Sequence, residues 1–221
     1  MAYSDPVPAG EVPPCIAQAP SRLEGYTHVA LYRFEEDRGP ALVDTTRTGQ
    51  GTLHGGLRTE GQCGQAVTFE AEDAHLELSA VGPVFGGGIA VGIWVRPSST
   101  EAGEAHLVGD GGGGVATFQL VLVQGIPTFR ISTHGGWRDL LRAAEPLEPN
   151  EWHYLQATYD LEAGSLFIDG SEAAQATIAY PMDGSYNTLY AGAIRSTTPC
   201  CSFAHRFRGN LDEIAIYRAG R

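Results

Sequence analysis

The chain has 221 residues and a formal net charge of −12 at pH 7, with 14 basic and 26 acidic side chains. This balance repels phosphate backbones and anionic lipid surfaces, so we expect no nucleic-acid partner. No apolar run approaches the roughly 20 residues that span a bilayer, so we expect no membrane insertion.

The first 24 residues contain five prolines, which oppose both helix and β-ladder pairing. We expect a leader or linker over residues 1–24 and one folded domain over residues 25–221. From His28 to Phe34 apolar residues alternate with the period of a strand, and a turn-rich stretch follows over residues 35–56. Further strands are expected at 65–70, 74–79, 89–96, 105–109, 116–123, 127–132, 138–143, 151–159, 164–169, 174–179, 186–193 and 205–217.

These short segments, together with 29 glycines, are typical of strands joined by tight turns. No segment sustains a 3.6-residue apolar period over three turns. The sequence therefore predicts an all-β fold, a two-sheet antiparallel β-sandwich.

The four cysteines, Cys15, Cys63, Cys200 and Cys201, lack C-x-x-C spacing, which favours disulfides over a metal-thiolate cluster. Neighbours on an extended chain point to opposite faces, so we expect Cys200 and Cys201 to reach Cys63 and Cys15 rather than each other. The sequence does not choose among the three possible connectivities. A disulfide requires an oxidising compartment, which predicts a secreted or cell-surface protein.

Several sequence blocks carry a family resemblance: Leu31–Glu36, Val43–Thr46 with Gly49–Leu53, Gly64–Phe69, Val91–Pro97, Glu151–Asp160 with Leu166–Gly170, and Phe207–Tyr217. In this order they resemble the concanavalin A-like lectin/glucanase superfamily, specifically its laminin G-like jelly rolls. The resemblance implies that the first and last strands pair side by side. The resemblance indicates the function less strongly than the fold. Packing in the core or on a sheet face is the best explanation for Trp94, Trp152, Tyr159 and Phe167.

The first and last strands also carry two acidic residues. Strict alternation places Glu36 on the face of Tyr32 and Phe34, and Asp212 on the face of Ile214. Because the end of one antiparallel strand lies beside the start of its partner, we expect both carboxylates at one edge of the core. Two buried anions need a counter-charge, and calcium with oxygen ligands is the usual choice outside the cell.

Asp44, in the neighbouring turn, is the expected third calcium ligand. Laminin G-like domains often hold a structural calcium, so the resemblance implies the same cofactor. The alternative is that Glu36 lies in a turn, and that Asp212 accepts hydrogen bonds from backbone N–H groups or pairs with an arginine such as Arg38.

Catalytic patterns are absent from the sequence. Glycan-hydrolysing branches of the superfamily carry carboxylates at E-x-D-x-x-E spacing on one strand. The acidic stretch at residues 70–77 lacks this spacing, and there is no G-x-S-x-G, P-loop or H-E-x-x-H pattern. We expect a protein that is not an enzyme. A catalytic Ser, His and Asp brought together from distant loops is the alternative that the sequence leaves open.

Ligand binding calls for exposed aromatic rings and polar groups on loops. Trp137 follows two glycines, so it is the first candidate for an open turn on which a sugar ring stacks. An equally good interpretation is that Trp137 covers the edge of the sandwich. The further candidates are His134, Tyr186, Asn187, Arg195 and His205.

We therefore expect a non-catalytic extracellular module of a larger exported polypeptide, binding a carbohydrate or an extracellular protein, with calcium. The alternative is a structural or adhesion spacer, and a glycan-active enzyme is the third hypothesis. An exposed Trp137 beside a polar groove favours the first. Two carboxylates about 5 to 10 Å apart in a cleft favour the third.

Overall fold

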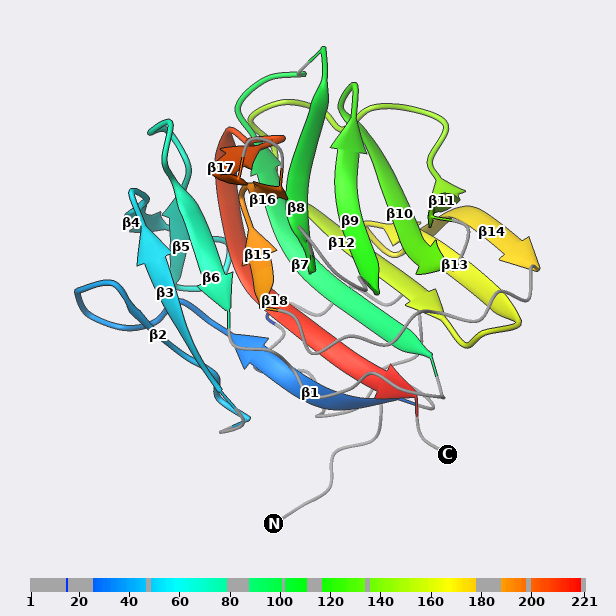
Figure 1. Cartoon of the computed structure of the whole chain (residues 1–221), viewed down its shortest axis with the longest axis horizontal. Coiled ribbons are helices and arrows are strands. Elements are labelled where there is room, and N and C mark those ends of the chain that lie inside the picture. Colours follow the sequence, from blue (N-terminus) through cyan, green and yellow to red (C-terminus); the bar gives the residue numbers. More distant parts are fainter. Residues whose placement is uncertain are drawn as a thin grey trace.

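The computed structural model describes residue 15 and residues 26–46, 49–78, 88–100, 102–110, 117–133, 136–177, 188–197 and 200–219. These residues form strands and turns, with no helix among them, and two antiparallel sheets stack as a sandwich (Figure 1). The predicted all-β jelly-roll class is confirmed. Residues 1–25 other than Cys15 lie outside the described residues, so the leader stays a prediction.

Sheet I contains the first and last strands of the chain, which lie side by side at the bottom of Figure 1. Its order is β14-β13-β12-β7-β18-β5-β4, and β1 and β5 pair with different parts of the same edge of β18. The strands are β1 (Tyr26–Tyr32), β4 (Leu57–Glu60), β5 (Gln65–Thr68), β7 (Ile89–Pro97), β12 (His153–Tyr159), β13 (Ala163–Ile168), β14 (Ser171–Thr177) and β18 (Gly209–Ala219).

Sheet II has the order β11-β10-β9-β8-β15-β6-β3-β2. A separate hairpin of β16 (Ile194–Thr197) and β17 (Cys200–Ala204) follows β15. The strands of sheet II are β2 (Ala41–Val43), β3 (Gln50–His54), β6 (His75–Leu78), β8 (Glu104–Asp110), β9 (Phe118–Val123), β10 (Ile126–Thr133), β11 (Gly136–Arg142) and β15 (Leu189–Ala191).

The main core lies between the two sheets and follows the two-residue period of the strands. On β7, Ile89, Val91, Ile93 and Val95 all face this core and are fully buried. Facing residues of sheet II, such as Leu120 and Phe129, complete it. The alternating apolar residues from which these strands were predicted are thus the residues that form the core.

The opposite face of sheet I carries a second apolar cluster. Trp94, Tyr154 and Tyr217 pack there and are at most 6% exposed. Gly92 makes room for it, because a Cβ at this position would collide with the Tyr154 hydroxyl. The packing role predicted for Trp94 is therefore confirmed, on the outer face of the sheet.

The predicted pairing of the first and last strands is confirmed. Tyr32 lies opposite Ile214, and Tyr26 lies opposite Ala219. The pairing of β18 with β7, however, shifts register between Asp212 and Ala215, and Glu213 has a φ of 44°. Two residues of β18 there oppose one residue of β7, which is a β-bulge.

Five strands fall outside the predicted set. The stretch expected to be turn-rich, residues 35–56, contains β2 and β3, and β4 follows directly. The other two are β16 and β17. All five are three to five residues long, which is too short for a period of two to stand out against turn residues.

Candidate functional site

Glu36, the first predicted calcium ligand, forms an ion pair with an arginine. Arg58 Nη1 lies 2.9 Å from Glu36 Oε2, and the backbone N–H of Val43 donates to Glu36 Oε1 at 2.6 Å. Arg58 also donates to the carbonyl of Phe34 at 2.8 Å. The Arg58 guanidinium thus supplies for Glu36 the counter-charge that was expected from a metal ion.

Asp44, the predicted third ligand, is buried and ties its turn to β1. Its Oδ1 accepts hydrogen bonds from the backbone N–H of Leu31 at 3.0 Å and of Thr46 at 2.9 Å. The Thr46 hydroxyl donates to both carboxylate oxygens. These donors already balance the carboxylate, so Asp44 has a structural explanation without a cation.

Asp212 lies on the outer face of sheet I, not on the core face of Ile214 as alternation predicted. The bulge at Glu213 inserts one residue, and Asp212 consequently pairs with Trp94, a residue of the outer cluster. Its Oδ2 accepts from the backbone N–H of Cys63 at 2.8 Å. Its Oδ1 is buried and has no hydrogen-bond partner among the described residues.

Burial raises the pKa of the Asp212 carboxyl to about 7. The backbone N–H groups of Cys63 and Glu213 oppose this shift, while the charges of Glu213 and Glu35 add to it. Glu213 is itself fully buried, and its Oε1 lies 3.7 Å from Nε of Arg33. Acidic groups do crowd one another beside β18, but they are Asp212, Glu213 and Glu35.

The three predicted calcium ligands are therefore not brought together. Among the described residues, two groups of three His, Cys, Asp or Glu side chains bring their ligand atoms within 4.8 Å of one another. Neither contains Glu36, Asp44 or Asp212. They are Cys15 with Cys63 and Glu213, and His54 with His75 and Glu77.

The disulfide pairing differs from the expected one, because Cys15 bonds to Cys63. Cys63 precedes β5, and its own N–H contacts Asp212, so the bond holds Cys15 against sheet I. Cys200 and Cys201 begin β17, in the hairpin beside sheet II. Side-chain direction at residues 200–201 can be read from the sequence. The sequence does not show that these residues and Cys63 lie beside different sheets.

A groove on the outer face of sheet II, here called the sheet II groove, is the strongest candidate for ligand binding. It has a volume of about 230 Å³. One wall comes from strands β8 to β11 and the other from the β16–β17 hairpin and the residue after it. The lining residues are Glu104, Gln119, Arg130, Trp137, Ile194, Arg195, Ser196, Ala204 and His205.

Local pairing explains why these side chains face outward. Arg130 lies opposite both Gln119 and Asp139, and its chain neighbours Phe129 and Ile131 face the core. Arg130 Nε donates to Asp139 Oδ1 at 2.9 Å, and Nη1 donates to Glu104 Oε2 at 3.0 Å. One guanidinium therefore pairs with two carboxylates and fixes that of Glu104, which lines the groove.

Trp137 and Arg195 are brought together by the fold, although 58 positions separate them in sequence. Trp137 lies on β11, is 41% exposed and lines the same groove as Arg195 and His205. The other three candidates, His134, Tyr186 and Asn187, lie outside the described residues. The sequence did not single out Glu104, Gln119 and Arg130. Gln119 and Arg130 are polar residues between core residues on β9 and β10, and Glu104 is the first residue of β8.

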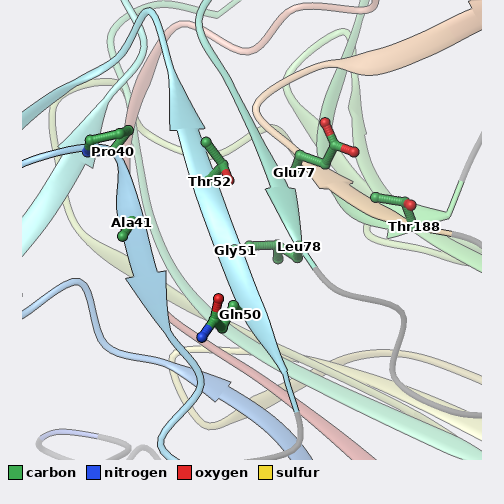
Figure 2. A pocket seen from close by; sticks show the side chains of 8 residues that line it. All are labelled: Pro40, Ala41, Gln50, Gly51, Thr52, Glu77, Leu78 and Thr188. Atoms are coloured by element: carbon green, nitrogen blue, oxygen red, sulfur yellow. The ribbon is translucent and has the colours of Figure 1, made fainter.

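A second pocket, here called the β3 pocket, has a volume of about 410 Å³. Figure 2 shows that its side chains come mainly from the neighbouring strands β2, β3 and β6. They are Pro40, Ala41, Gln50, Gly51, Thr52, Glu77, Leu78 and Thr188. Although larger, this pocket offers no aromatic ring on which a sugar could stack, so the sheet II groove is the better candidate for a glycan.

None of the described segments forms a helix long and apolar enough to cross a membrane.

Several solved structures resemble this chain in fold. Domain 4 of AbnA, an extracellular GH43 arabinanase from Geobacillus stearothermophilus, in complex with arabinotriose, is 18% identical with a TM-score of 0.66, over 88% of this chain and 94% of that one. The binding domain of Paraclostridial Mosquitocidal Protein 1 is 15% identical with a TM-score of 0.68, covering 88% of this chain and 49% of that one.

The botulinum neurotoxin serotype D ligand binding domain, in complex with N-acetylneuraminic acid, is 10% identical with a TM-score of 0.66. The match covers 88% of this chain and 48% of that one, so this chain spans about half the length of the toxin domains. No curated protein matches the sequence. A laminin G family model, described as the concanavalin A-like lectin/glucanases superfamily, matches residues 70–220. The chain therefore belongs to the concanavalin A-like lectin/glucanases superfamily.

Proposed function

We propose that this chain is a non-catalytic carbohydrate-binding module of an extracellular protein, and that the sheet II groove is its glycan site. The observation that carries the proposal is the exposed ring of Trp137 beside a polar groove. Sugar rings stack on aromatic faces, while their hydroxyls need fixed donors and acceptors. Arg130, Glu104 and Gln119 offer both kinds of group.

The similar structures support this proposal. Two of them are complexes with carbohydrates, arabinotriose in one and N-acetylneuraminic acid in the other. Others are described as binding or receptor-binding domains. Because these chains are at most 18% identical, their ligands indicate a class of partner rather than a particular sugar.

The geometry of the groove supports binding over hydrolysis. Glycosidases hold two carboxyl groups on either side of the scissile bond. Here Glu104 and Asp139 both pair with the Arg130 guanidinium, which lies between them, and Asp139 does not line the groove. The position of the bond to be cleaved is thus taken by a side chain of the protein.

Extracellular localisation and calcium are further parts of the proposal. The Cys15–Cys63 disulfide supports an oxidising compartment. Calcium is supported by Asp212 alone, whose buried Oδ1 has no partner among the described residues and whose neighbours Glu35 and Glu213 are acidic. Glu36 and Asp44 use their oxygens for Arg58 and for donors of the protein itself.

The test of the glycan site is the Trp137→Ala variant on a glycan array. We expect the wild-type chain to bind a defined set of glycans, and the variant to lose that signal, because it lacks the aromatic face on which a sugar ring stacks. The melting temperature should change little, since the ring is 41% exposed.

Leu57→Ala is the matched control, since Leu57 is 68% exposed and lies on β4 of sheet I, outside the groove. It removes exposed apolar surface without touching the lining residues, so its array signal should equal that of the wild type. A glycan signal that persists in Trp137→Ala would overturn the groove as the site. A wild-type chain that binds no glycan would favour the spacer alternative.

A further inference from the structure

Two histidines and a glutamate converge on the outer face of sheet II, outside the groove. His54 of β3 lies directly opposite His75 of β6. Glu77 is two residues beyond His75, so it projects from the same face of the strand. The ligand atoms of the three side chains lie within 4.8 Å of one another, and His54 Nε2 is 3.8 Å from Glu77 Oε2.

The His75 ring is fixed in one tautomer and one orientation. Its Nδ1 lies 2.7 Å from the carbonyl oxygen of Asp73. A carbonyl can only accept, so Nδ1 carries the proton and Nε2 keeps its lone pair. Phe203 of the β16–β17 hairpin stacks on the ring at a centroid distance of 3.7 Å, which holds the ring in place.

We propose that His54, His75 and Glu77 form a binding site for a divalent transition-metal ion, with Zn²⁺ as the best match. Two imidazoles and one carboxylate are a common donor set for zinc, and the backbone carbonyl on Nδ1 of His75 is the usual outer-shell partner of a ligating histidine. Calcium does not suit this site, because it requires six to eight oxygen ligands.

The required movement falls on the exposed side chains. Tetrahedral zinc holds its donor atoms about 3.3 Å apart, so donor atoms that now lie within 4.8 Å of one another must approach by up to about 1.5 Å. His54 is now stacked on His75 with the rings nearly parallel, 6° apart, and it must turn to direct a nitrogen at the ion. The His54 and Glu77 side chains are 43% and 47% exposed, which permits this, while His75 stays in place.

Three protein ligands leave the fourth position of a tetrahedral ion open for water or another ligand. Glu77 also lines the β3 pocket, so the bound ion stands at the wall of that pocket. Glu77 and Thr52 are opposite each other in the ladder, and both line that pocket (Figure 2). A bound ion would thus place a positive charge beside the concave surface of the β3 pocket.

The experiment is calorimetric titration of ZnCl₂ into the full chain after removal of metals with a chelator. We expect one ion per chain for the wild type. His54→Ala and Glu77→Gln should each weaken binding by at least the 10- to 100-fold that loss of an outer-shell partner costs. Replacement of Zn²⁺ by Co²⁺ should give the visible absorption of a tetrahedral ion in the wild type and lose it in both variants.

His153→Ala is the matched control, because His153 Nδ1 also pairs with a carboxylate, Asp169, at 2.8 Å, but on sheet I and in neither group of three. Its zinc affinity should equal that of the wild type. Absence of binding heat, or binding that neither His54→Ala nor Glu77→Gln weakens, would overturn the site. No glycan enters this assay, so its result is independent of the groove.

Discussion

The Asp212 carboxyl is fully buried, and burial raises its pKa from 3.8 to about 7. In the unfolded chain it loses its proton near pH 4, whereas in the folded chain it keeps the proton until about pH 7. The folded state therefore binds more protons between these values, and this residue lowers the stability of the fold as pH rises through that window.

Replacement of Asp212 by Asn removes this dependence, because the amide stays neutral at every pH. We expect the free energy of unfolding of Asp212→Asn, minus that of the wild type, to rise between pH 4 and pH 7, by up to about 4 kcal/mol. Urea denaturation at several pH values, with chelator present, measures it. A difference that does not vary with pH would contradict the burial of this charge.

Individual residues of the groove were only partly predictable. Trp137 could be chosen from the sequence because two glycines before an aromatic residue suggested an open turn; the ring is exposed, but it lies on β11 and not on a turn. Arg130 and Gln119 could not, because a polar residue between core residues is what any solvated strand face shows. They line a groove only because the β16–β17 hairpin lies over that face of sheet II. The sequence does not predict this packing.

At the scale of elements, the Cys15–Cys63 bond joins residues 48 positions apart. In the chain-entropy account, closing a loop of this length stabilises the fold by about 4 kcal/mol. We expect a variant with both residues changed to Ser to lose a stability of this order in guanidinium denaturation. Cys63→Ser alone should lose as much, and a loss below about 1 kcal/mol in either variant would contradict this role.

Strands were predicted where alternation is long, as on β7 and β18, whereas the pairing of β1 with β18 was predicted from the family resemblance. The bulge at Glu213 was not predicted. It reverses the face of the sheet to which the preceding residues of β18 point, and it leaves the apolar pattern after it unchanged. Leu211 and Ile214 both face the core, although they are three positions apart. A strict period of two therefore carries Asp212 to the wrong face, and with it the predicted calcium site.

For the whole molecule, Asp212 does not act alone as pH changes. Burial lowers the pKa of His28 and of His106 to about 4. These residues are neutral in the folded protein, so their contribution to stability is lost as pH falls from about 6.5 towards 4. This trend opposes that of Asp212, which is why the difference between variant and wild type, rather than either profile, isolates the carboxyl.

The calcium proposal is also tested on the whole molecule. An ion that binds only the folded state raises its stability by mass action, so we expect CaCl₂ to raise the melting temperature of the chelator-treated wild type at pH 8. Asp212→Asn should show no such rise, because the neutral amide lacks the negative charge that attracts the ion. A wild-type melting temperature that is the same in calcium and in chelator would count against calcium here.

The bond between Cys15 and Cys63 also changes how the fold carries tension. Tyr26 and Ala219 are paired, so a pull on the two ends would by itself peel β1 from β18 one residue pair at a time. With the bond intact, a force applied to the chain before Cys15 is transmitted through the disulfide to Cys63 and β5. The strand β1, which lies between the two cysteines in sequence, then bears none of this force. Reduction would return that load to β1.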